Sequence, residues 1–322
     1  MLRYGFLASI CLALLASIHS AGAQSYPDRT VRVIVPTSPG GSIDTTARVV
    51  AAKLSEKWGK PVIIENRPGA SMITGADAAA KSQPDGYTLL VAHDGTTAMN
   101  QAVYPKLPYN AQRDFEPVAL ISAIPLVILL HPQVEAKTVK DLITFAKANP
   151  GKLNHATGGT ATLLALELFK AMSGVDIASI PYRGAAPAIT GLMAGETQMI
   201  FADLASGNAA MQSGRVRTLA VTTLQRAKQL PDLLTVDESG LPGYETATWI
   251  AAFAPAGTPN AVVVKIESDI KAALAQPDVR ERLEKLGMDI RSGTSDELRN
   301  KLAADIAKWT RLVKEKNIQI AQ

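Results

Sequence analysis

The stretch "FEPVALISAIPLVILLHP", residues 115–132, decides the architecture that we expect for this chain. It is a long apolar run interrupted by Pro125, which is typical of a strand that leaves one sheet and enters another. A second extended segment, "YETATWIAAFAPAGTP" at 244–259, also ends in turn residues. Because these two crossings bracket a block of alternating strands and helices, we expect two α/β lobes joined by two hinge strands.

The segments around the crossings alternate between strand and helix patterns. We expect strands at 30–36, 61–66, 86–94, 152–156, 176–182, 198–203 and 216–223, and helices at 42–58, 71–82, 138–149, 162–173, 185–194, 205–213, 259–275, 277–286 and 295–316. Such alternation is typical of a mostly parallel sheet. One lobe is expected to contain residues 24–125 with 250–322, and the other residues 126–249.

Residues 1–23 have the pattern of a secretory signal peptide. Arg3 precedes an apolar segment at 6–18, and the small residues at 21–23 fit a cleavage site, so we expect cleavage after Ala23 and a periplasmic protein. The apolar segment is too short for a comfortable membrane span. Cys11, the single cysteine of the chain, lies within it, so the mature chain should contain no disulfide.

Charge and missing motifs argue against several functional classes. The net charge is +4 and the basic residues are scattered, so nucleic acid is not an expected partner. The Gly-Lys pairs at 59–60 and 151–152 are followed by Pro and Leu, so neither is a P-loop, and the chain has no G-x-S-x-G elbow. His93, His131 and His155 lack metal-ligand spacing. We therefore expect no catalytic residue, no metal and no cofactor.

Three strands run into glycine-containing turns that begin helices. The turns lie in "VRVIVPTSPGGSIDTTAR" at 31–48, "LLVAHDGTTAM" at 89–99, with Gly95 and Thr96, and "LNHATGGTATLLAL" at 153–166. At the carboxyl ends of parallel strands, backbone N–H groups and the positive end of the helix dipole favour an anion. Each turn also fits a plain helix start, but one in each lobe would grip a small anion from both sides. Ser42 and Thr160 would either cap their helices or donate a hydroxyl to the ligand.

Four further residues lie at strand ends, each with two interpretations. Arg183, in "IPYRGAAPAITGLMAGE", would either reach an anionic group bidentately or remain a surface arginine. Asp203, in "QMIFADLASG", would either accept a hydrogen bond from a ligand amine or hydroxyl or cap the next helix. His93 and His155 end strands near the expected cleft, where a histidine bonded to the backbone is the favoured interpretation over a ligand contact.

Several segments in this order resemble one known family. They include "VRVIVPTSPGGSIDTTAR", "PVIIENRPGA", "PDGYTLLVA", "IPYRGAAPAITGLMAGETQMIF" and "FAPAGTP", and they are similar to the Bug family of extracytoplasmic solute receptors associated with tripartite tricarboxylate transporters. The resemblance covers essentially the whole mature chain. It implies a type II periplasmic-binding-protein fold whose two lobes close on a small carboxylate. It also implies inner-membrane permease subunits as partners, with a two-component sensor kinase as the alternative; we expect a monomer.

The resemblance also assigns residues to the ligand site. By matching position, the first loop is Pro39, Gly40, Gly41 and Ser42, and the second is 157–162, with Thr157, Gly158, Gly159, Thr160 and Ala161. Asp203 matches an aspartate that often helps to set ligand choice in the family. The second loop departs from the family pattern, because "HATGGTATLLALEL" is shorter and more apolar and has Leu163 or Leu164 near the usual His. We therefore expect a less polar ligand body, aliphatic or aromatic.

Overall fold

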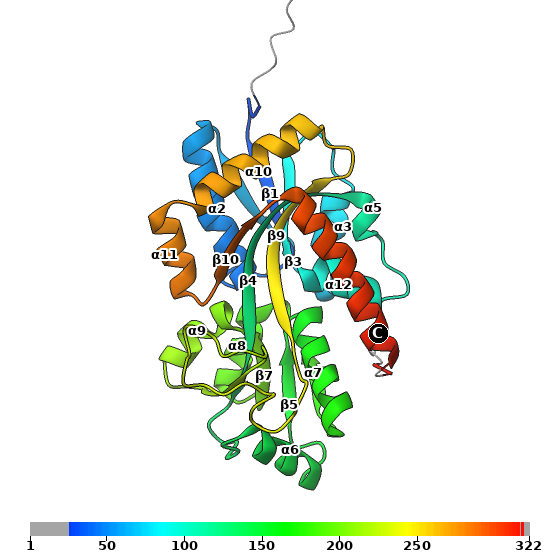
Figure 1. Cartoon of the computed structure of the whole chain (residues 1–322), viewed down its shortest axis with the longest axis vertical. Helices are drawn as coiled ribbons and strands as arrows, with labels where there is room; N and C mark the ends of the chain where they lie inside the picture. Colours follow the sequence, from blue (N-terminus) through cyan, green and yellow to red (C-terminus); the bar gives the residue numbers. More distant parts are fainter. Residues whose placement is uncertain (1–25, 316, 319–322) are drawn as a thin grey trace, which may run out of the picture.

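The computed structural model describes residues 26–315 and 317–318. The expected signal peptide at 1–23 lies outside these residues. Within the described part, none of the helices combines the length and the apolar character that crossing a membrane requires. Figure 1 shows an upper part, built from the N-terminal segments and the C-terminal helices, and a lower part, built from the middle of the chain.

The upper part begins with three strands that pair as the sequence predicts. β1 (Val31–Val35) pairs in parallel with β2 (Val62–Asn66) and with β3 (Thr88–His93). Most of β1 and all of β3 are buried, because helices cover the sheet. The helical elements here are α2 (Ser42–Trp58), η1 (Ala70–Met72), α3 (Ile73–Ala80), the π-helical turn η2 (Gly95–Met99), α4 (Asn100–Val103) and α5 (Ala111–Asp114).

Two long strands connect the upper and lower parts, as the apolar crossings predict. β4 (Phe115–Leu130) pairs with β9 (Ala247–Pro255) from Phe115 to Pro125, and from Leu126 onward it pairs with two strands of the lower part. The switch therefore falls at Pro125, which interrupts the apolar run. β9 also pairs with β3, so both long strands are built into the upper sheet.

The lower part is the second series of strands and helices. Its strands are β5 (Asn154–Thr157), β6 (Ala178–Pro181), β7 (Met199–Asp203) and β8 (Arg217–Val221), and its helices are α6 (Val139–Ala148), α7 (Thr160–Ser173), α8 (Ala185–Ala194) and α9 (Leu204–Gln212). β5 pairs in parallel with β6 and β7, whereas β7 and β8 run antiparallel to β4.

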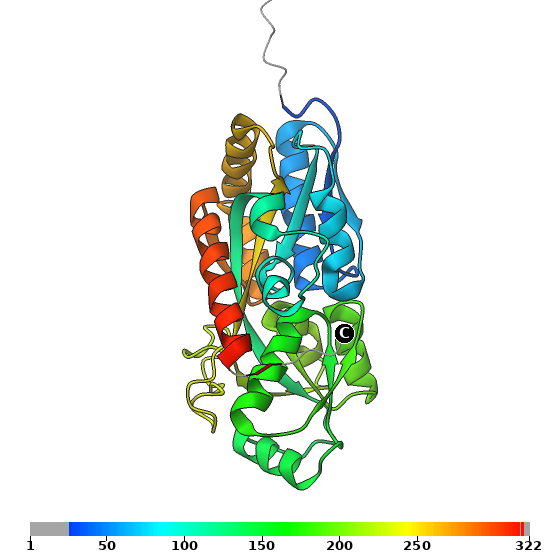
Figure 2. The same cartoon turned by 90° about the vertical axis from the view of Figure 1, so that its right-hand side faces the viewer.

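The C-terminal segment returns to the upper part. It forms α10 (Asn260–Leu274), α11 (Pro277–Lys285), β10 (Asp289–Gly293) and α12 (Ser295–Glu315). The sequence did not indicate β10, because "DIRSG" has no apolar alternation and Ser292 adopts a left-handed φ of 48°. In the turned view of Figure 2, α12 runs down one side of the upper part toward the lower part.

Two expectations about local structure are wrong. The sheet is not mostly parallel, because the central strand β4 runs antiparallel to β7, β8, β9 and β10. The helix expected at 71–82 begins only at Ile73, because Ser71 and Met72 have positive φ angles that interrupt it.

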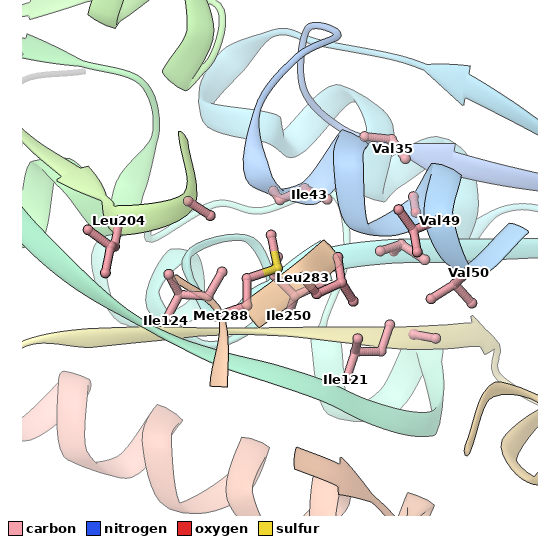
Figure 3. Packing of buried hydrophobic residues seen from close by; sticks show 14 of the residues in the cluster. Val35, Ile43, Val49, Val50, Ile121, Ile124, Leu204, Ile250, Leu283 and Met288 are labelled. Carbon is pink, nitrogen blue, oxygen red and sulfur yellow. The ribbon is translucent and has the colours of Figure 1, made fainter. Parts of the chain in front are cut away.

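Apolar packing continues from the upper part into the lower part. Leu204 of α9 belongs to the same buried cluster as Ile124 of β4 and Met288 (Figure 3). A Cβ built on Gly287 would lie 2.5 Å from Cγ of Leu204, so the glycine allows this close approach. A second small cluster joins Trp309 of α12 to Ala161 and Leu164 of α7. The two parts are therefore packed directly against each other.

Candidate functional site

The first loop connects β1 to α2 and faces the lower part. Pro39 and Gly40 are exposed, whereas Gly41 and Ser42 are buried. Gly40 has a φ of +93°, which glycine adopts without strain. The backbone N–H of Ser42 donates to Oγ of Ser206 at 2.9 Å, so the start of α2 is joined to α9.

The second loop connects β5 to α7 and is buried throughout. The Gly158 N–H donates to Oγ1 of Thr162 at 3.1 Å. A Cβ on Gly158 would lie 2.8 Å from the backbone nitrogen of Ala185, so only glycine fits this approach to α8. The Thr160 hydroxyl donates to the Asn100 side-chain oxygen of the upper part. The second loop therefore contacts both a neighbouring helix and the opposite part of the molecule.

The capping role considered for Ser42 and Thr160 is wrong. The N-cap positions of α2 and α7 are Gly41 and Gly159, and neither helix has a side-chain cap. Both hydroxyl residues lie one position inside their helices, which leaves their hydroxyls for other partners. Thr160 uses its hydroxyl on Asn100, and, against the raising effect of burial, the Ser42 side chain contributes to lowering the pKa of Asp203.

Four helix N-termini meet where the two parts touch. α2 and α7 bring Gly41 and Gly159, and α8 and α9 begin after Gly184 and Asp203. Ala185 at the start of α8 lies close to both loops, because a Cβ on Gly41 would be 3.9 Å from its Cβ. Helix N-termini present N–H groups and partial positive charge, so their convergence favours a bound anion.

Asp203 is both a helix cap and part of this contact. Its Oδ1 accepts from the Ser206 N–H at 2.8 Å, so the capping interpretation of Asp203 is confirmed. Burial raises the pKa of Asp203, and hydrogen bonds from Ser206 and Ser42 partly offset this rise. The sequence did not predict that Ser206 belongs to this contact. The only local signal for it is its position three residues after an N-cap aspartate.

The remaining predicted residues lie around the same contact in different ways. Thr96 is fully buried and donates to Sδ of Met72 at 3.4 Å. Ala161 lies beside the turn at 89–99, because a Cβ on Gly95 would be 3.0 Å from the backbone nitrogen of Ala161. Arg183 is exposed, and its carbonyl oxygen accepts from the Ser38 hydroxyl at 2.8 Å. A role for its guanidinium in anion binding stays a prediction.

The two strand-end histidines are neutral and buried. Nε2 of His155 accepts from the Phe201 N–H at 3.0 Å, which confirms the backbone-bonded interpretation of this residue. Burial lowers the pKa of His155 to about 3 and that of His93 to about 4. No group of three or more His, Cys, Asp or Glu within residues 26–315 and 317–318 is arranged to hold a metal ion.

Asp94, the N-cap residue of η2, is the most unusual titrating group beside the site. Its Oδ1 accepts from the Gly95 N–H at 3.0 Å and from the Thr248 hydroxyl of β9. Complete burial raises the pKa of Asp94 to about 7, against the lowering effect of the Thr248 hydrogen bond. The nearby Asp305 carboxylate raises this pKa further, and Lys301 opposes it.

This raised pKa predicts a specific dependence of stability on pH. Between about pH 4 and pH 7 the unfolded state has lost the Asp94 proton while the folded state keeps it, so stability falls as pH rises through that window. The loss is at most on the order of 4 kcal/mol, three pH units at about 1.4 kcal/mol each. Asp94→Asn should remove this part of the slope in thermal melts between pH 4 and 8. If the melting temperatures of the two proteins change equally with pH over this range, the prediction for Asp94 is contradicted.

Comparison with protein families identifies the chain. Residues 46–318 match the model of the tripartite tricarboxylate transporter family receptor, TctC. A protein encoded in the tcbD-tcbE intergenic region of Pseudomonas sp. (strain P51) is 36% identical, over 99% of this chain and 96% of its own length. BugT of Bordetella pertussis is 34% identical, over 98% of each chain.

Solved structures agree with the family match. R. palustris Rpa4515 with adipate has a TM-score of 0.88 at 34% identity and covers 91% of this chain and 99% of its own. The periplasmic binding protein BugD has a TM-score of 0.87 at 32% identity, over 91% and 99% of the two chains. MatC from Rhodopseudomonas palustris with bound malate has a TM-score of 0.87 at 32% identity, over 89% and 100%. The expected α/β periplasmic-binding-protein fold is confirmed, and this chain belongs to the Bug-type receptors of the tripartite tricarboxylate transporter family.

Proposed function

We propose that this receptor is periplasmic, captures a small carboxylate between two lobes and delivers it to inner-membrane permease subunits. The lobes are residues 24–125 with 250–322, and residues 126–249, and β4 and β9 form the hinge between them. The observation that carries the proposal is the convergence of the N-termini of α2, α7, α8 and α9 at the contact between the two parts. The helix N-termini of both lobes carry partial positive charge, which favours a bound carboxylate.

The polar contacts between the lobes support opening and closing about this site. Ser38 bonds to the Arg183 carbonyl, Ser42 to Ser206, and Thr160 to Asn100. A ligand or water can satisfy each of these groups when the lobes separate, so breaking the contacts costs little. A ligand that binds both lobes shifts the population toward the closed state. The relatives solved with adipate and malate make a dicarboxylate the first class to test.

The most direct test is to identify the ligand that the protein retains. Mature protein purified from the periplasmic fraction should release a carboxylate on denaturation, detected by mass spectrometry. Calorimetry with that acid should give one site per chain. N-terminal sequencing of the same sample should begin at Gln24. A folded protein that retains no carboxylate and binds none from a broad panel would overturn the proposal.

A further inference from the structure

A cavity of about 850 Å³ opens between the two parts, next to the second loop. Ala70, Ser71 and Ile73 line it from the upper part, and Thr157 and Leu163 line it from the lower part. Because Thr157 is the first residue of the second loop, the cavity adjoins the proposed carboxylate site.

Met72 packs against the ligand loops beside this cavity. Its neighbours on both sides of the sequence line the cavity, whereas Met72 itself is buried, with 6% of its surface exposed. Its Sδ accepts from the Thr96 hydroxyl at 3.4 Å. A Cβ built on Gly159 would lie 2.8 Å from its Cε. The thioether therefore fills the space beside two residues assigned to the ligand site.

The backbone that places Met72 is strained. Ala70, Ser71 and Met72 have φ angles of 45°, 51° and 71°, a left-handed run that side chains with a Cβ disfavour. Such strain persists only where the surroundings fix it. Here the Tyr104 hydroxyl donates to Oγ of Ser71 at 2.9 Å, and the Asn100 amide donates to the Ser71 carbonyl at 3.3 Å. Asn100 also accepts from Thr160, so the strained segment is tied to the second loop.

We propose that Met72 is a specificity-determining residue that limits the length of the carboxylate held by the two loops. This inference rests on the proposed function. A chain that extends from the loops toward the cavity meets the thioether, so short carboxylates are bound and longer ones are rejected. With Met72 shortened, the cavity receives the distal part of a longer chain. Lys106, which lines the cavity, then supplies a cation for a distal carboxylate.

The test is a chain-length series of straight α,ω-dicarboxylates, namely succinate, adipate, suberate and sebacate, measured by calorimetry. For the wild-type protein, we expect affinity to fall by about tenfold or more between adipate and suberate, since a filled pocket rejects added methylenes by roughly this factor. Met72→Ala should remove the fall and raise suberate and sebacate affinity by about tenfold or more. Met72→Leu, which conserves volume, should keep the wild-type profile.

Three outcomes of this experiment can be told apart: a variant that does not fold, a wild-type protein that binds no carboxylate, and a Met72 that does not limit ligand length. Truncating a buried Met can destabilise the protein, so Met72→Gly provides a second short variant that also relieves the left-handed strain. A flat chain-length profile of the wild-type protein overturns the inference without any variant. A fall that persists unchanged in the folded short variants also overturns it. A wild-type protein that binds no carboxylate at all overturns the proposed function instead.

Discussion

Replacing Gly41 with aspartate should abolish carboxylate binding while the protein stays folded. Gly41 has φ −82° and ψ 176°, an extended conformation that any residue adopts. A Cβ there would lie 3.7 Å from Oγ of Ser206, which is ordinary van der Waals contact. Aspartate is also a good N-cap, so α2 should not be weakened. Its carboxylate, however, occupies the positive end of the helix and repels the ligand carboxylate. We expect an affinity loss of about 100-fold or more by calorimetry.

Gly41→Asn is the matched control for this prediction. Asparagine has nearly the same size and also caps helices well, but it carries no charge. We expect it to keep affinity within about tenfold of wild type. An equal loss in both variants would make the effect steric. Normal binding by the aspartate variant would show that the first loop does not hold the ligand carboxylate.

Gly184→Ala should weaken binding by hindering closure rather than by touching the ligand. Gly184 is the N-cap of α8, with φ +136°, and a Cβ on it would overlap the hydroxyl oxygen of Thr37 in the upper part. Thr37 is buried, so it cannot easily move away. The clash is absent when the lobes separate, so the variant should populate the open state. Affinity falls with the closed fraction, and overpacking of this kind predicts a loss of roughly 10- to 100-fold.

A double variant separates closure from backbone strain at this position, because Gly184 has φ +136° and ψ 175°, a conformation that residues with a Cβ rarely adopt. Gly174→Ala tests a Cβ at a milder left-handed position, φ +69°, with nothing within 4 Å, and should leave affinity unchanged. Adding Thr37→Ala to Gly184→Ala removes the clashing hydroxyl and should restore part of the affinity. Small-angle scattering with saturating ligand should show a more expanded particle for Gly184→Ala than for wild type. Equal scattering curves together with unchanged affinity would contradict a closure role.

The order of strands and helices follows closely from the sequence, because it depends on local patterns. The apolar run interrupted by Pro125 predicted the strand that changes sheets, and β4 changes its partners at that residue. The short strand β10 was not predicted, because its pairing with β4 depends on tertiary packing rather than on a local pattern. The same explanation applies to the start of α3, where Asn100 and Tyr104 hold a left-handed run that local propensity disfavours.

The sequence by itself determined that Gly-rich turns end strands and begin helices, because this pattern depends only on residues that are neighbours in the sequence. Only the tertiary structure decided what those turns face. Ser42 meets Ser206 across 164 positions of the chain, and Met72 meets Gly159. Such contacts arise where β4 and β9 bring two sheets together, and no periodicity within either segment encodes the distance between them. Hydrophobic spacing specifies each element, whereas packing between elements selects the few side chains that share the site.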